Sequence, residues 1–385
     1  MVSQEVVSDP LIKKIVRESV EMWTREDPDN PQSAEIAEDY RKYVYRKWVF
    51  IALCIIGTVL VVGYALSVGD YHISFLDTYG IVWDHLIGNE PMTQEEKLED
   101  SIIFTQRMPR IIVGILAGAG LAIAGVVMQS TLMNPLADPY TTGVSSGASF
   151  GATLGIVAGF SILGVSQYGT VVNAFVFSLI PMAVIVVVSR IKNASPTTMI
   201  MAGIAVMYIF NAFTTVISLM ADPNDLQELY RWTVGSLAFA NAEDIPVITA
   251  VVIVVGIVLQ LMTNKLNILA SGDESAKALG VDAEKLRRIC LVLVALLSAT
   301  VVSFTGLIGF VGLVAPHIVR TVIGPDNRFL LPASAAFGAL LLVLADLIGR
   351  TVISPAVLQV GVITAFLGGP LFLWLILRKN STIWG

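Results

Sequence analysis

The sequence predicts an all-α polytopic membrane protein, and three observations support this fold class. Of the 385 residues, 55% are hydrophobic, and the mean hydropathy is +0.76. Charged residues make up only 14% of the chain, whereas a soluble domain carries about 25%. The apolar residues also gather in runs of about 20, which is the length a helix needs to cross about 30 Å of hydrocarbon. Water cannot solvate so much apolar surface, so the expected solvent is lipid.

The first 47 residues are polar and carry charges of both signs. Ser8-Asp9-Pro10 is a typical helix start, with a capping side chain followed by proline. Apolar residues then recur at helical spacing at Ile12, Val16, Val20 and Trp23. We expect residues 1–47 to form a cytoplasmic extension with an amphipathic helix, lying on the membrane or on a partner. An accessory packing role is the favoured reading of that helix.

A transmembrane domain is expected at residues 48–379, with about ten apolar segments. The segment at 308–320 is short for a span, and Gly309, Gly312 and Pro316 interrupt it. We therefore expect a broken or tilted helix buried among others there. The ten segments are 48–67, 108–128, 143–163, 168–189, 198–220, 244–263, 287–305, 308–320, 329–349 and 358–377.

The distribution of basic residues predicts the orientation. With a cytoplasmic N-terminus and ten alternating spans, 19 of the 24 Lys and Arg residues fall inside. The positive-inside rule favours this arrangement, so both termini are expected in the cytoplasm of a cell-membrane protein. Two outer loops, 68–106 and 221–244, are then acidic, and the stretch from Leu226 to Leu237 could form a short interfacial helix.

The inner loop at 264–288 is too long for a simple turn. Ser271-Gly272-Asp273 can start a short helix that continues through Ala276 and Leu279, and Gly280 can end it with a positive φ. Such a pair of helices within 267–286 suits a partner with a groove. No P-loop occurs in the sequence, so if transport uses ATP, the nucleotide chemistry belongs to another subunit.

Two polar residues are candidates for the wall of a pore. Gln129 is a lone amide in a Gly- and Ala-rich span, where an amide is costly unless it bonds a neighbour or faces water. Asn134 begins a turn, Asn-Pro-Leu-Ala-Asp-Pro, at the inner end of that span. Close helix packing is the simpler explanation of the glycines in this span.

Three arginines are expected at the outer face. Arg107 and Arg110 flank Met108-Pro109, and Arg350 follows Asp346 at i,i+4. They could bind carboxylates of a delivering protein, or Arg107 and Arg110 could pair locally with Glu99, Asp100 or the rest of the preceding loop. Asp346 and Arg350 are expected to pair with each other. An ion-coupled secondary transporter using Asp346 and His317 is the alternative function.

In combination, these motifs resemble the FecCD-type permeases, the type II ABC importers of iron-siderophores, haem and vitamin B12. Arg107-Met-Pro-Arg110 is similar to the family's Arg-Leu-Pro-Arg. Asn134-Pro-Leu-Ala-Asp-Pro139 with Gly143 matches a second signature, and Gly306 through Arg320 matches the strongest one. The pattern covers about residues 46–379. Val357 and Gln359 replace a glutamate and a proline that the family often has before the last span.

The resemblance implies a permease subunit with ten helices that works as a homodimer and is not itself an enzyme. Two cytoplasmic ABC ATPase subunits would carry ATP and Mg²⁺ and would bind near Ala276, Leu279 and Gly280. An extracytoplasmic substrate-binding protein would dock on Arg107, Arg110 and Arg350. No cofactor or metal in this chain, and no nucleic-acid partner, is expected. A membrane scaffold without transport is a further alternative.

Overall fold

The computed structural model describes residues 31–69, 71, 73–89, 93–164, 168–190, 195–353 and 356–377. The amphipathic helix expected after Ser8 lies outside the described residues. The chain divides into two compact units, Met1–Val49 and Phe50–Gly385. Helix α3 (Pro31–Ser67) begins in the first unit and continues into the second. Every regular element among the described residues is helical, which confirms the predicted class.

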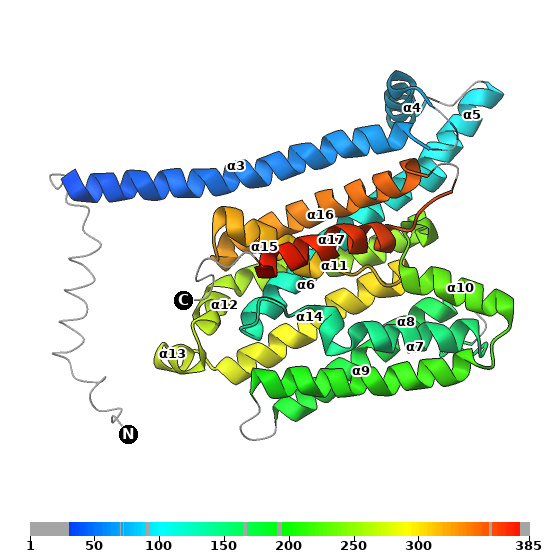
Figure 1. Cartoon of the computed structure of the whole chain (residues 1–385). Coiled ribbons are helices and arrows are strands. Elements are labelled where there is room, and N and C mark those ends of the chain that lie inside the picture. Colours follow the sequence, from blue (N-terminus) through cyan, green and yellow to red (C-terminus); the bar gives the residue numbers. More distant parts are fainter. Residues whose placement is uncertain are drawn as a thin grey trace, which may run out of the picture. The chain divides into compact units, whose positions relative to one another are not determined.

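Each of the ten predicted segments coincides with a helix (Figure 1). Seven of the described helices are long and apolar enough to cross a membrane, and α15 and α17 are shorter apolar helices. Together with α3, the helices are α6 (Met108–Thr131), α7 (Val144–Ile156), α8 (Gly169–Ser189), α9 (Pro196–Ser218), α11 (Ile245–Leu261), α14 (Ala283–Thr305), α15 (Val311–Ile323), α16 (Asn327–Thr351) and α17 (Val360–Leu377).

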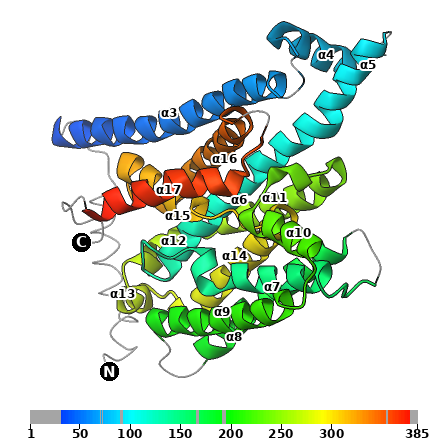
Figure 2. The same ribbon diagram turned by 45° about the vertical axis from the view of Figure 1, so that its right-hand side comes forward.

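Helix α6 is the central element of the second unit. It continues α5 (Gln94–Ser101) and η1, a π-helical segment (Ile102–Arg107), in one long rod (Figure 2). It packs against α11, α14, α15 and α16. Its most apolar stretch is 78% buried, whereas that of α9 is only 11% buried. Helix α6 is therefore enclosed by protein, and α9 presents most of its surface outward.

Glycines set the distance between α6 and its neighbours. An ideal Cβ on Gly118 would lie 2.3 Å from the carbonyl oxygen of Gly338 in α16. A Cβ on Gly125 would lie 1.7 Å from the carbonyl oxygen of Gly312 in α15. Helices in lipid associate through such close backbone approach, because burial of apolar side chains gives little advantage there. Close helix packing thus explains why Gly118 and Gly125 stand where α6 meets its neighbours.

Replacing Gly118 with alanine is expected to destabilise the protein by about 1–3 kcal/mol, the usual cost of overpacking. The added methyl group would meet backbone rather than a flexible side chain, so α6 and α16 must separate. The matched control is Gly256→Ala in α11, where the new methyl would meet only the Ile123 Cδ1 at 3.5 Å. Thermal unfolding in detergent measures both variants. Equal midpoints for the two would contradict the close contact.

The broken helix predicted around 308–320 is present. Helix α14 ends at Thr305, Gly306 has φ +69°, and α15 begins only at Val311. Two freed backbone groups find partners: the Ser236 N–H donates to the Thr305 carbonyl at 2.8 Å, and the Ile308 N–H donates to the Tyr140 hydroxyl at 3.0 Å. Such partners are what allow irregular backbone at membrane depth.

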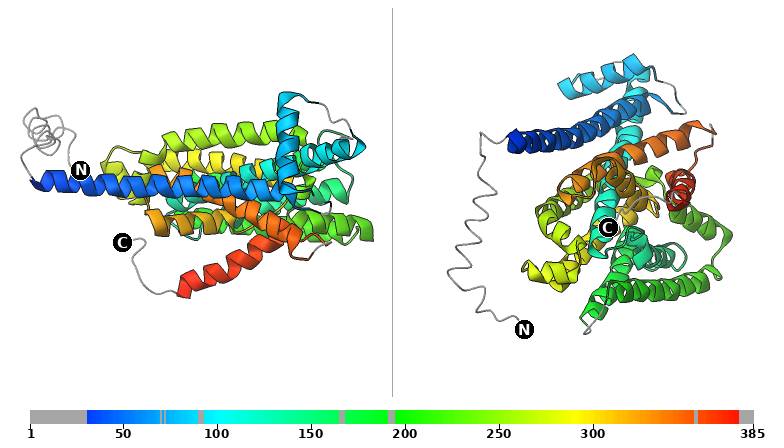
Figure 3. Two further views of the ribbon diagram at one scale, coloured as in Figure 1. Left: turned by 90° about the horizontal axis from the view of Figure 1, so that it is seen from above. Right: turned by 60° about the vertical axis from the view of Figure 1, so that its left-hand side comes forward.

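Short helices lie at the two ends of the bundle (Figures 1 and 3). At one end lie α12 (Thr263–Ala270) and α13 (Asp273–Ala278). At the other lie α4 (Phe75–Ile87), α5 and α10 (Pro223–Val234). Helix α10 confirms the short helix expected after Leu226. We name these the α13 end and the α4 end.

Candidate functional site

At the α13 end, the chain forms the predicted pair of short helices. Helix α13 stops before Leu279, and Gly280 has φ +76°, the conformation that favours glycine. The Asp282 side chain then caps α14 by accepting the Lys285 N–H at 2.9 Å. The turn chemistry expected from the sequence is therefore confirmed.

The three candidate coupling residues differ in exposure. The Leu279 side chain is 66% exposed, and nothing lies within 4 Å of an ideal Cβ on Gly280. Ala276, in contrast, is fully buried. Ala276 thus holds α13 against the bundle, while Leu279 and Gly280 remain on the surface that a partner could reach.

An ion pair fastens α13 to two spanning helices. Arg287, in the first turns of α14, is only 1% exposed, and its Nη2 donates to the Asp273 carboxylate at 2.6 Å. The Arg287 Nε donates to the carbonyl oxygen of Thr131, the last residue of α6, at 3.1 Å. One guanidinium therefore joins α13, α14 and α6. Sequence analysis did not single out this residue, because Arg287 and Thr131 are far apart in the chain.

A second network joins α12 to α16. The Asn267 side chain donates to the Asp326 carboxylate and accepts the Asn327 N–H, both at 2.8 Å. The Ser130 hydroxyl of α6 bonds the Asn327 side chain at 3.0 Å. Burial alone would raise the pKa of Asp326, but hydrogen bonds from Arg328 and Asn267 outweigh it and lower that pKa to about 2. The carboxylate is thus charged at neutral pH, and the network is stable there.

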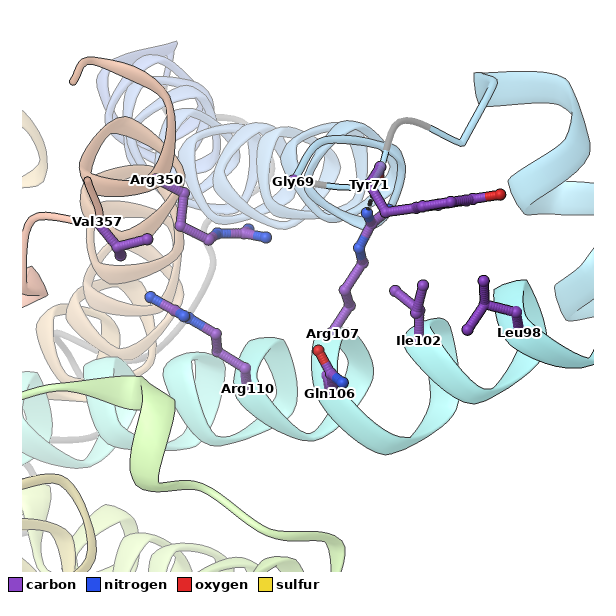
Figure 4. Close-up of a pocket in the computed structure, with 9 residues that line it drawn as sticks. All are labelled: Gly69, Tyr71, Leu98, Ile102, Gln106, Arg107, Arg110, Arg350 and Val357. Atoms are coloured by element: carbon purple, nitrogen blue, oxygen red, sulfur yellow. Dashed lines mark hydrogen bonds between the residues drawn. The ribbon is translucent and has the colours of Figure 1, made fainter. Parts of the chain in front are cut away.

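At the α4 end, the three candidate docking arginines surround one cavity of about 360 Å³ (Figure 4). It lies between α16, the η1–α6 rod and the linker after α3. Arg110 reaches from α6 toward α16, and Arg350 reaches from α16 across the cavity toward the side where Arg107 lies. The lining residues are Gly69, Tyr71, Leu98, Ile102, Gln106, Arg107, Arg110, Arg350 and Val357. The structure therefore brings Arg350 next to Arg107 and Arg110, which are far from it in the sequence.

Asp346 balances two of the three arginines. It is 2% exposed, and it accepts hydrogen bonds from Arg110 Nε at 2.9 Å and Nη2 at 2.8 Å. The Arg350 Nε lies 3.1 Å from the other carboxylate oxygen, which confirms the predicted i,i+4 pair. Arg110 thus pairs with Asp346 and not with Glu99 or Asp100, the local alternative, and Asp100 bonds His85. An unpaired carboxylate, as an ion-coupled carrier would need, is not found at Asp346.

Backbone carbonyls at the end of α3 and in the linker after it accept hydrogen bonds from the other arginine groups. Arg107 is 6% exposed and donates to the Leu66 and Tyr71 carbonyls. The Arg350 Nη1 donates to the Ala65 and Val68 carbonyls, each at 3.2 Å. The Arg350 Nη2 is buried, and no hydrogen-bond partner reaches it from the part of the chain that the structure describes. The described lining of the cavity thus carries three guanidinium groups and no acidic side chain, which suits a carboxylate.

Of the two candidate pore residues, Gln129 is buried and Asn134 is half-buried. Gln129 is fully buried, and its amide nitrogen is 3.5 Å from the Leu313 carbonyl oxygen of α15. The Asn134 side chain accepts the Leu136 N–H at 2.9 Å, and its own N–H donates to the Gln129 carbonyl. In this conformation Gln129 contacts α15 and Asn134 closes a turn. Their lining of a pore stays a prediction.

These features define a class of protein: a multi-pass helical membrane subunit with an exposed, bonded helix pair at one end and a cationic cavity at the other. The chain belongs to the FecCD transport family, whose family model matches residues 55–378. Members of this family are the non-catalytic membrane components of ABC transporters.

Similar proteins support this membership. An ABC transporter permease protein of Methanocaldococcus jannaschii is 39% identical over 91% of this chain and 100% of its own length. The hemin transport system permease protein HmuU of Yersinia pestis is 39% identical over 71% of this chain and 83% of its own. A solved inward-facing conformation of a metal-chelate type ABC transporter matches with a TM-score of 0.74 at 29% identity, over 85% of this chain and 98% of the other. The fold is thus that of a type II ABC importer permease.

Proposed function

We propose that this chain is the permease subunit of an ATP-driven importer, and that its substrate is an iron chelate, haem or a corrinoid. The observation that carries the proposal is the α13 end: exposed Leu279 and Gly280 directly follow α13, the helix that Arg287 bonds to α6 and α14. A partner that moves α13 therefore moves two spanning helices. Similarity to a hemin permease and to a metal-chelate transporter supports the substrate class.

The proposal includes three kinds of partner. Two ATPase subunits bind the α13 end, and a substrate-binding protein places a carboxylate in the arginine cavity at the α4 end. A second copy of the chain completes the pore, and the outward-facing surface of α9 leaves apolar side chains such as Tyr208 and Phe213 for lipid or for that copy. The mass of the detergent-solubilised transporter tests the homodimer. Twice 41.3 kDa is expected for the permease part, and the mass of a single chain would contradict the homodimer.

Orientation is part of the same proposal, with the α13 end and both termini in the cytoplasm. Single cysteines at Lys277 and Asn89, both exposed, report the two ends. The native Cys54 and Cys290 are buried, so they give little background. In intact cells a membrane-impermeant maleimide should label Asn89→Cys and spare Lys277→Cys. The reverse pattern would invert the topology.

Reconstitution tests the function itself. The chain in proteoliposomes with its ATPase and a loaded binding protein should accumulate iron chelate, haem or corrinoid only when ATP is supplied. Without the ATPase, it should accumulate none, whatever the proton or sodium gradient. Uphill uptake by the chain alone would establish the ion-coupled alternative instead.

A further inference from the structure

Helix α4 has a largely exposed apolar face, and Tyr79 is the residue by which this face touches α3. Six large apolar residues on it are 47–80% exposed: Phe75, Leu76, Tyr79, Trp83, Leu86 and Ile87. At about 100° per residue, these positions fall within an arc of roughly 120° on one side of the helix. So much apolar surface on one side of a short helix is not expected to face water.

Other faces of α4 already serve the protein and the solvent. Thr78 is buried, and Ile81 and Val82 pack against the cluster that contains Ile103 and Ile111. His85 stacks on Phe104, with ring centroids 3.7 Å apart, and bonds Asp100 at 2.9 Å.

The third face is polar. Asp77 and Asp84 are both exposed, and they project away from the bundle-facing side and from the apolar face. Apart from Tyr79, which touches Gly63 of α3, the apolar face is thus separate from the surface that holds α4 in the fold.

The direction of α4 differs from that of the spanning helices. It is seen almost end-on in Figure 1, where α6 and α16 run across the view, and it crosses their direction in Figure 3. If α6 and α16 cross a membrane, α4 therefore lies roughly in the membrane plane. That is the arrangement of an interfacial helix.

The depth of α4 along α3 follows from one contact. The Tyr79 hydroxyl occupies the space where a Cβ on Gly63 would stand, at 1.9 Å from that ideal position. Gly63 lies four residues before the end of α3, which is about 6 Å at 1.5 Å per residue. Interfacial helices bury their apolar face about 5–10 Å into the headgroup boundary, so α4 would lie at a matching depth if α3 ends at the headgroups.

Composition favours lipid over a protein partner at this face. Tyr79 and Trp83 belong to the two residue types that gather at membrane–water boundaries. The surface also continues onto α3, where Val59, Leu60 and Tyr64 are exposed. Helix α4 carries no Lys or Arg, so its attraction to the bilayer does not require anionic lipid.

We propose that α4 is an interfacial helix, embedded by its Phe75, Trp83 and Leu86 face in the lipid leaflet at the α4 end of the bundle. The inference rests on the spanning orientation of the bundle, but it does not depend on ATP, the substrate or the sidedness of the protein.

Spin labels on opposite faces of α4 test the proposal. Leu76→Cys and Leu86→Cys report the apolar face, and Asp77→Cys and Asp84→Cys are the matched exposed controls on the same helix. Cys54 and Cys290 are replaced by alanine, and the full chain is placed in nanodiscs of neutral phosphatidylcholine. Labels at 76 and 86 should collide several-fold more with oxygen than with a water-soluble nickel complex, and labels at 77 and 84 should show the reverse preference.

Two results would overturn the proposal. Nickel access at positions 76 and 86 equal to that at 84 would place the face in water. Protection of 76 and 86 from both reagents would place protein over the face, from a second copy or another partner. Since neither result involves transport, both are distinct from a failure of the proposed function. Unchanged gel-filtration profiles and thermal midpoints would show that the labelled variants are folded.

Discussion

Replacing Leu279 with aspartate is expected to abolish ATP-driven uptake. Leu279, which directly follows α13, is 66% exposed, and we propose that it enters a groove of the ATPase. Losing a buried leucine costs about 1.5–3 kcal/mol, and burying an unpaired carboxylate costs several more, so uptake should fall at least about 100-fold. Uptake and co-purification of the ATPase are the measurements.

Leu279→Met is the matched control for this variant. It keeps the volume and the apolar character, so uptake should remain within a few-fold of the wild type. Because the side chain is exposed in the isolated chain, neither variant should change the thermal midpoint of the permease alone. Normal uptake by the Leu279→Asp variant would show that Leu279 does not contact the ATPase.

Asp273→Asn separates binding of the ATPase from transmission of its movement to the spanning helices. It leaves Leu279 in place but removes the charge that Arg287 pairs with at 2.6 Å. We expect the ATPase still to co-purify and to hydrolyse ATP, while uptake per ATP falls, because α13 is no longer fastened by an ion pair to α6 and α14. Unchanged uptake per ATP would limit Arg287 to a structural role.

Replacing Asp346 with alanine is expected to destabilise the folded chain by about 3–5 kcal/mol, the cost of breaking a buried ion pair from one side. Two guanidinium groups would then face each other without the carboxylate that both contact. The matched control is Glu228→Ala on α10, an exposed acid whose loss should change stability by less than about 0.5 kcal/mol. Unfolding in detergent compares the two variants. Equal stability would contradict the role of Asp346 in neutralising Arg110 and Arg350.

A triple variant tests whether the buried charges of Arg110, Asp346 and Arg350 serve docking or stability. Arg110→Met, Asp346→Leu and Arg350→Met together remove the whole cluster, and replacing a buried ion cluster by apolar residues is often neutral for stability. Stability should therefore return toward the wild type while binding of the substrate-binding protein is lost. Retained binding would exclude the arginine cavity as the docking site.

The sequence predicted the elements better than it predicted their contacts. All ten apolar segments, the break after Thr305 and the Gly280 turn follow from local patterns of hydrophobicity, glycine and proline, and the structure has each of them. Such features depend on residues close together in the chain.

Long-range partners were not predicted, for a physical reason. Arg110 meets Asp346 from a position 236 residues away, and Arg287 meets the Thr131 carbonyl 156 residues away. Nothing in the local sequence of either residue marks such a partner. Ala276 shows the same limit within a short helix, because the periodicity that placed it on α13 did not show that it faces inward.

Helix α6 links the two ends of the molecule by its own length. Thr131 at one terminus accepts from Arg287, and Arg110 near the other binds Asp346, about 30 Å away at 1.5 Å per residue. If α6 moves as one rod, binding of a partner at one terminus and binding of a partner at the other are thermodynamically linked. Suppose that one nucleotide state of the ATPase weakens binding of the external protein several-fold. Binding of that protein must then disfavour the same nucleotide state by the same factor.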